Sequence, residues 1–337
     1  MKQAKWAAAF TCACLAASLL AGCSSEAGES EVSDSPASDP TTTTTTTTEA
    51  AEKNTTIQFR TQEDTDTLGV WWWQINTIQD SDGLLGFLQD NAVSEIYLCV
   101  DGMEDNDSAR ASFADVRAFV KKAGDMGMRV AALTGEYSWI EPDSTGFERY
   151  VEKFNAYQQA AAEDEKFYSM HLDVEPHQHP DFKTGDEGRA EVMQMFADFA
   201  VQKAAPAAEE SGTILEWDIP FWMTDIVKDG DGQEIELARL MARTCDTIAI
   251  MSYRDTAEKI LDVAKEEIEY AKEYGCKIIL GVETRSSEGD AVSFMEEGKA
   301  VMVEEMGKVH ESLKSTFPDG NFGMAVHQAS VWYTLQD

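Results

Sequence analysis

Apolar and polar residues alternate in two patterns along the last four fifths of the chain. Eight short runs are mostly continuously apolar, which is typical of parallel strands covered on both faces. Between them, apolar residues recur every three to four positions, the spacing of a helix with one buried face. The expected strands are Leu68–Gln74, Glu95–Asp101, Arg129–Glu136, Tyr168–Glu175, Ile214–Trp222, Thr247–Tyr253, Lys277–Glu283 and Phe322–Gln328.

Seven expected helices connect these strands. They are Leu84–Asn91, Ala109–Met126, Phe147–Ala162, Glu187–Glu210, Glu234–Arg243, Ala257–Tyr274 and Ala291–Thr316. Gly127, Gly212 and Gly275 stand where helices should end, because glycine suits the left-handed helix cap. Strict alternation with eight strands predicts an α/β fold of the (β/α)8 TIM-barrel class. We expect no eighth helix, since the chain stops soon after Tyr333.

An open doubly wound sheet is the competing architecture. Such sheets carry a glycine-rich phosphate loop after the first strand, and the sequence has none there. The barrel hypothesis is therefore preferred, with one domain over residues 67–337.

The first 66 residues have a different composition. Lys2 and Lys5 precede an apolar stretch that is short for a membrane span, and Leu20-Ala21-Gly22-Cys23 follows. This tetrapeptide resembles the lipobox of bacterial lipoproteins, which implies a signal peptide over residues 1–22 and lipid on the Cys23 thiol. An ordinary secretory signal or an uncleaved anchor is the alternative. Residues 23–66 are rich in Ser, Thr and acids, and we expect a disordered tether on a membrane-anchored protein that faces the cell exterior.

The net charge of the chain limits the kinds of molecule that it can bind. The formal net charge is −35, most of it within residues 67–337, and so acidic a surface repels nucleic acid. We expect a monomer.

Cys99, Cys245 and Cys276 remain in the domain, and an odd number argues against a disulfide framework. Cys245 and Cys276 begin consecutive strands and could pair, or all three could be buried thiols.

The fourth strand carries the most informative residues. His171, Asp173 and Glu175 alternate at period two and so share one face of the strand, which Pro176 ends. Ionisable groups on a strand that looks buried are costly unless they do chemistry or are paired. In a barrel the active site lies at the C-terminal ends of the strands, where this cluster falls.

Acids and aromatic residues also end the other strands. Carboxylates surrounded by aromatic faces suit a sugar, whose C–H faces stack on indoles. The alternative for tryptophan is core packing, and at least one of Trp71–Trp73 must face the helices because strand residues alternate. Residues expected to bind substrate are Trp72, Trp73, Glu136, His171, His177, Asp218, Trp222, Asp255, Arg285, His327 and Trp332. His171 could instead be a satisfied interior histidine, and Arg285 could pair with a barrel acid.

Glycoside cleavage needs a carboxylic acid at the leaving oxygen and a second group at the anomeric carbon. Glu175 is the candidate acid, because the like charge of Asp173 favours its protonated form. One hypothesis pairs Glu175 with Asp173 and Tyr253. Here the chain resembles family 18 glycoside hydrolases (chitinase-like barrels), whose fourth strand ends D-x-x-D-x-D-x-E and whose sixth carries M-x-Y-D. The resemblance implies that the N-acetyl group of the substrate acts as nucleophile.

This chain departs from the family 18 pattern. Tyr168 and His171 stand at the two earlier Asp positions, and Arg254 stands at the last, with Asp255 one residue later.

In the second hypothesis Glu175 is acid/base and Glu283 is the nucleophile. Here the chain resembles retaining glycosidase barrels with glutamates after strands four and seven, although Val174 replaces the Asn of their N-E-P motif. The strings HLDVEPHQHPDF, WDIPFW and MSYRDTAEKI also resemble a group of bacterial lipoproteins predicted to be barrels. That last resemblance implies no particular activity.

Two other functions compete with glycoside hydrolysis. His171, Asp173, Glu175, His177 and His179 have the residue types of a zinc site, as in metal-dependent hydrolases. The H-x-H motif of such barrels is missing from the first strand, and we expect neither a metal nor another cofactor. A carbohydrate-binding lipoprotein without turnover is the other alternative. The sequence thus predicts a cell-surface glycoside hydrolase acting on an extracellular glycan.

Overall fold

The computed structural model describes residues 54–286 and 291–337. Eight parallel strands close into a barrel, in which each strand pairs with the next along the chain and β12 pairs with β1. The barrel strands are β1 Thr67–Trp72, β2 Glu95–Cys99, β5 Arg129–Thr134, β6 Ser169–Leu172, β7 Ile214–Pro220, β10 Thr247–Met251, β11 Lys277–Glu283 and β12 Phe322–His327. The predicted TIM barrel is confirmed.

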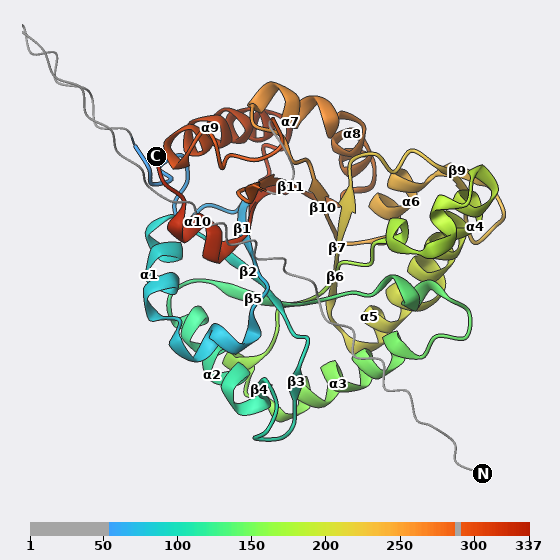
Figure 1. Cartoon of the computed structure of the whole chain (residues 1–337), viewed down its shortest axis with the longest axis horizontal. Helices are drawn as coiled ribbons and strands as arrows, with labels where there is room; N and C mark the ends of the chain where they lie inside the picture. The colour runs from blue at the N-terminus through green and yellow to red at the C-terminus, as the bar shows by residue number, and fades with distance from the viewer. Residues whose placement is uncertain (1–53, 287–290) are drawn as a thin grey trace, which may run out of the picture. The chain divides into compact units, whose positions relative to one another are not determined.

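Helices surround the strands on the outside of the barrel (Figure 1). They are α1 Asp82–Asp90, α2 Phe113–Asp125, α3 Gly146–Ala160, α4 Asp186–Phe199, α5 Ala205–Ser211, α6 Leu237–Thr244, α7 Ala257–Val263, α8 Lys265–Tyr274, α9 Lys299–Thr316 and α10 Ala329–Thr334. Gly212 and Gly275 adopt the left-handed cap expected of them. The expectation of no eighth helix was wrong, because the few residues after β12 suffice to form α10.

Other helix predictions also need correction. The helix expected over 257–274 is divided into α7 and α8, and the one expected from Ala291 begins at Lys299. The segment expected as one helix over 187–210 is divided by a π-helix, Ala200–Ala204, just before Pro206, which lacks the N–H of a regular helix. The helix expected from Glu234 begins later, because Glu234–Glu236 forms β9 and pairs antiparallel with β8 Ile226–Lys228. A second short ladder joins β3 Met103–Glu104 to β4 Ala111–Ser112.

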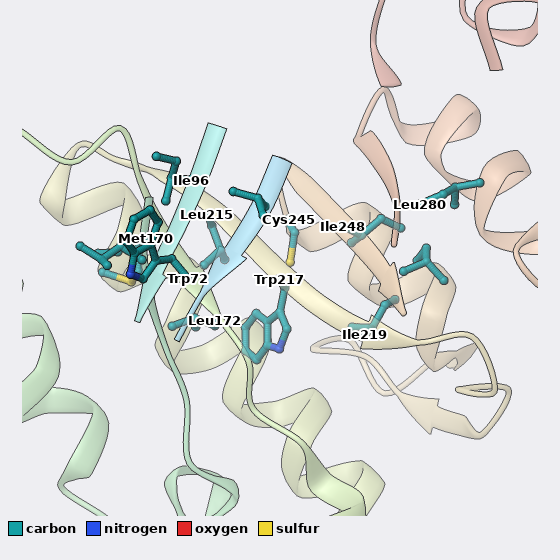
Figure 2. Packing of buried hydrophobic residues seen from close by; sticks show 14 of the residues in the cluster. Trp72, Ile96, Met170, Leu172, Leu215, Trp217, Ile219, Cys245, Ile248 and Leu280 are labelled. Carbon is teal, nitrogen blue, oxygen red and sulfur yellow. The ribbon is translucent and has the colours of Figure 1, made fainter. Parts of the chain in front are cut away.

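Alternation along each strand separates two apolar layers. Met170 and Leu172 of β6 and Trp217 of β7 point outward into the core between strands and helices (Figure 2). Residues between them in sequence point into the barrel, where Trp71 and Tyr97 pack with small side chains such as Ala131. The interior is tight, since a Cβ at position 69 would lie 2.4 Å from the Tyr97 hydroxyl.

Residues 54–66, which the sequence analysis places in the disordered tether, pack against the barrel. Ile57 and Arg60 are buried, and the Arg60 guanidinium forms a 3.0 Å ion pair with Asp66 and donates to the Ala92 carbonyl. The described domain therefore includes this segment. The expected signal peptide, the Cys23 lipidation site and residues 23–53 lie outside the described residues.

Two further sequence expectations concern cysteines and membrane helices. Cys99, Cys245 and Cys276 are buried free thiols, so the pairing of Cys245 with Cys276 is not formed. Within residues 54–286 and 291–337, every helix is too short or too polar to cross a bilayer.

Candidate functional site

Strand β6 brings its polar residues to the mouth of the barrel, the end where the strands' carboxyl termini lie. His171 and Asp173 face the interior, as predicted, while Leu172 and Val174 pack outward. Pro176 ends the extended chain by starting a short 3-10 helix, Pro176–Gln178. The Glu175 side chain, 22% exposed, stands just before this turn and is accessible to a ligand.

His171 lies between two carboxylates of the neighbouring strand β7. Its Nδ1 is 3.3 Å from Glu216 Oε2 and its Nε2 is 2.9 Å from Asp218 Oδ1. Burial alone would lower the pKa of His171, but Asp218 and Glu216 outweigh it and raise the pKa to about 10. Trp71 Nε1 donates a 2.8 Å hydrogen bond to the other oxygen of Asp218. A buried cation thus lies between two acids beneath the mouth.

Asp173 is the mouth carboxyl with a strongly shifted pKa. Burial raises the pKa of Asp173 well above its ordinary value, and the charges of Asp218 and Glu175 raise it further, while His171 opposes them. Asp173 Oδ1 is enclosed and lacks a hydrogen-bond partner among the described residues. Asp173 therefore favours the protonated form beside Glu175, which reverses the expectation that the charge of Asp173 keeps the proton on Glu175. We call His171, Asp173, Glu175, Glu216 and Asp218 the β6–β7 cluster.

A second acid–histidine arrangement closes the opposite side of the mouth. Glu283, 2% exposed, accepts hydrogen bonds from the backbone N–H groups of Thr284 at 2.8 Å and Arg285 at 2.7 Å. His327 Nδ1 lies 2.9 Å from Glu283 Oε2, and Trp73 Nε1 donates to His327 Nε2 at 2.7 Å. Because Nε2 accepts, Nδ1 carries the proton and His327 is neutral. Glu283, His327 and Trp73 form the β11–β12 cluster.

Tyr253 lies close enough to both clusters for their carboxylates to shift its pKa. Burial raises the pKa of its phenol well above the ordinary value, and Glu283, Asp218, Asp173 and Glu175 raise it further, in that order. One protonated hydroxyl therefore lies within the field of four mouth carboxyls. The Tyr253 ring also lies 5.8 Å from that of His327.

Aromatic side chains extend the mouth beyond β6 and β7. His177 Nε2 is 3.7 Å from Glu175 Oε1, and its ring meets Trp222 edge to face at 5.4 Å. Phe182 packs beside Trp222 at 6.1 Å. The Arg189 guanidinium lies 5.7 Å from the Trp222 ring. His177, Phe182 and Trp222 thus form a partly exposed wall of the mouth next to Glu175.

Three predicted substrate residues lie at the rim. Glu136 is exposed after β5, and the Arg285 side chain is exposed while its backbone binds Glu283. Asp255 forms a 3.1 Å ion pair with Lys259 of α7. His179, a candidate metal ligand, is buried 3.6 Å from Glu141.

Two predicted substrate residues lie away from the mouth. Trp72 points outward, 2% exposed, and donates to Thr77 Oγ1 while packing on Phe119. Trp332 is fully buried on α10 against Phe87. Both predictions were wrong, because Trp72 alternates with the inward Trp71 and Trp73, and α10 buries its indole against α1.

The sequence reasoning also missed two interior residues, Trp71 and Glu216. Both could have been found by period-two spacing, since Trp71 shares a face with Trp73 and Glu216 shares one with Asp218. For the metal alternative, no group of three or more His, Cys, Asp or Glu within the described part of the chain is arranged to hold an ion.

Comparison with known proteins gives no family for this chain. No protein-family model matches it, and no curated protein matches it. A GH18 chitinase structure from Pseudoalteromonas aurantia is 10% identical with a TM-score of 0.44, over 80% of this chain and 98% of that one. An endo-β-1,4-mannanase from Thermotoga petrophila is 10% identical with a TM-score of 0.47, over 79% and 69%.

The tryptophan synthase A-subunit from Pyrococcus furiosus is 14% identical with a TM-score of 0.41, over 80% of this chain and 89% of that one. Likenesses this remote carry no argument about chemistry, so function must be argued from the site.

Proposed function

We propose that this protein is a glycoside hydrolase in which Glu175 donates the proton to the leaving oxygen. The observation that carries the proposal is the β6–β7 cluster, where an accessible carboxyl stands beside Asp173, whose protonated form burial favours. Partly exposed aromatic side chains, above all Trp222, lie next to this pair and suit the C–H faces of a sugar.

In the proposed reaction, the glycosidic C–O bond breaks as the Glu175 proton passes to the leaving oxygen. The carbonyl oxygen of a substrate N-acetyl group forms a bond to the anomeric carbon, and water later replaces it with Glu175 as base. Asp173 and Tyr253 would hold that acyl group, since both favour their protonated, donating forms.

Glu283 is the weaker candidate for a nucleophile. Its side chain is 2% exposed, and its oxygens accept from two backbone N–H groups and from His327. A nucleophile must instead approach the anomeric carbon with a free lone pair. We therefore assign Glu283 to fixing His327 and the loop after β11.

The activity is tested by incubating the protein with a panel of glycans and measuring released reducing ends. Release by the parent and loss in Glu175→Gln support the proposal, with Glu152→Gln as the matched control because Glu152 is exposed on α3, outside the barrel. Stoichiometric binding of a glycan without product would indicate the carbohydrate-binding alternative. Inhibition by chelators, reversed by Zn²⁺, would indicate the metal-dependent alternative.

We also propose that the enzyme acts at the cell surface, held in the membrane by lipid on Cys23. Support comes from the sequence Leu20-Ala21-Gly22-Cys23 after a short apolar stretch. Cys23→Ser should release the protein from the membrane fraction into the medium. Retention of the variant in membranes would contradict the anchor.

A further inference from the structure

The buried ring of His171 has an environment that restricts its charge. Glu216 lies at one ring nitrogen and Asp218 at the other, and the side chains of all three residues are at most 2% exposed. His171 Nε2 and Asp218 Oδ1 are at ion-pair distance but are not aligned as a hydrogen bond, and neither atom has a hydrogen-bond partner in the described part of the chain. A neutral imidazole carries one N–H, so it can satisfy only one of two carboxylates, whereas an imidazolium satisfies both.

Two cations, Arg129 of β5 and Lys277 of β11, lie on other strands of the barrel. Arg129 forms a 3.0 Å ion pair with Glu95, and both cations also interact with Glu216. The Tyr97 ring from β2 packs on the imidazole at 4.3 Å, and such a π-face favours a cationic ring. Leu133 of β5 pairs with His171 across the sheet. It belongs to an apolar cluster inside the barrel that also contains Trp71, Ala249, Ile279 and Ala325. Along β6 itself, Ser169 donates to Glu216, and Asp173 is the next ionisable group toward the mouth.

Asp218 faces a donor group at each oxygen. Trp71 Nε1, which can only donate, bonds Oδ2 at 2.8 Å, while Oδ1 faces His171. A proton on Asp218 would have to point at one of these donors. Asp173 has no such restriction, because its enclosed Oδ1 meets no hydrogen-bond donor within residues 54–286 and 291–337.

We propose that His171 is a positioning residue, held as an imidazolium between Glu216 and Asp218 and keeping both carboxylates ionised. With Asp218 ionised, the carboxyl proton at the mouth resides on Asp173, which lies beside Glu175. The inference concerns charge states, and it holds whether or not the mouth hydrolyses a glycan.

The first test is the ¹⁵N spectrum of the full-length protein's histidine ring nitrogens at pH 8. The chain has five histidines, and the His171 and His327 signals are assigned by loss in His171→Gln and His327→Gln. At this pH a histidine of ordinary pKa, about 6.5, is neutral. We expect two protonated nitrogens for His171, and for His327 one protonated Nδ1 and one bare Nε2. A bare nitrogen on His171 would overturn the proposal.

The second test locates the carboxyl proton by infrared difference spectroscopy at pH 7. The parent should show a carboxylic acid C=O band that is lost in Asp173→Asn. Loss of the band in Asp218→Asn but not in Asp173→Asn would overturn the assignment.

His171→Gln tests the positioning role itself. Without the imidazolium, Asp218 should take up a proton, so one further carboxylic acid band should appear, and adding Asp218→Asn should remove it. The matched control His327→Gln should gain none, because His327 is already neutral. An unchanged carboxylic acid signal in His171→Gln would show a purely structural role. Should that variant fail to fold, the absence of any ring with two protonated nitrogens from the parent ¹⁵N spectrum at pH 8 would still overturn the proposal, and Asp173→Asn and Asp218→Asn still locate the carboxyl proton.

Discussion

The mouth of the barrel contains two acid–histidine arrangements that differ in what contacts the second ring nitrogen. His171 meets a carboxylate at each nitrogen, whereas His327 meets Glu283 at one and the Trp73 indole N–H at the other. The first ring is therefore cationic and the second neutral, although both are buried. The group that contacts the second ring nitrogen, more than burial of the ring, therefore sets the charge of each histidine.

The two clusters also differ in how completely their carboxyls are satisfied. In the β11–β12 cluster, Glu283 is enclosed and accepts from several N–H groups. In the β6–β7 cluster, Asp173 has an enclosed oxygen without a hydrogen-bond partner among the described residues, and Glu175, which accepts from Gln178 Nε2, reaches solvent. A buried polar atom without a hydrogen bond destabilises the fold, and such atoms are typically retained where they serve a function. We therefore place the chemistry in the β6–β7 cluster and a structural role in the β11–β12 cluster.

The largest expected effect is that of Glu175→Gln. The amide keeps the shape of the side chain but has no proton to donate to the leaving oxygen. An acid catalyst contributes about 10²–10⁴ in rate, so kcat should fall by at least about 10² while glycan binding persists. Full activity of this variant on a substrate that the parent cleaves would place the chemistry outside the β6–β7 cluster.

Glu283→Gln should affect stability more than turnover. The amide oxygen can still accept from Thr284 and Arg285, but the amide NH₂ would face the His327 Nδ1–H that now binds Oε2, so we expect a loss of about 1–3 kcal/mol in the free energy of unfolding. Denaturant unfolding measures this loss, and kcat of the folded fraction should stay near that of the parent. A fall in kcat as large as that of Glu175→Gln, with rescue by azide, would instead identify Glu283 as the nucleophile.

Asp173→Asn should change how stability depends on pH. The native state keeps the Asp173 proton above pH 3.9, where the unfolded chain has released it, so this group lowers stability as pH rises toward its raised pKa. Replacing it should make the fall in stability between pH 5 and 7 shallower, by up to about 1.4 kcal/mol per pH unit. Equal slopes for parent and variant would mean that Asp173 is ionised in the native protein.

Asp173→Asn also tests the role of this proton in turnover. The Asn side chain still donates a hydrogen bond but cannot ionise. Any loss of activity at alkaline pH that comes from Asp173 ionisation should therefore disappear in the variant. Persistence of that loss would assign it to another group.

The smallest effect is expected for Trp222→Leu at the edge of the β6–β7 cluster. Losing an aromatic face beside a sugar should weaken binding by about 0.5–1.5 kcal/mol, seen as a higher KM with little change in kcat. Trp72→Leu is the matched control, since Trp72 faces the helices and should change stability but not KM. An unchanged KM for Trp222→Leu would remove this wall from the substrate site.

Strand periodicity predicted the barrel and part of the site, because alternation is a local property of the sequence. It placed His171 and Asp173 in the interior and, applied consistently, would have exchanged Trp72 for Trp71. The pairing of His171 with Glu216 and Asp218 depends on the register between β6 and β7, which local patterns do not encode. The burial of Arg60 depends likewise on Asp66 and on the Ala92 carbonyl, which the polar composition of residues 54–66 does not reveal.

The most direct measurement is a crystal structure of the Glu175→Gln variant soaked with mixed oligosaccharides. The account predicts a sugar stacked near Trp222, with its scissile oxygen about 3 Å from the side chain at position 175. It also predicts an acyl group between Asp173 and Tyr253. A sugar whose anomeric carbon lies against Glu283, with position 175 remote from the scissile bond, would contradict the assignment.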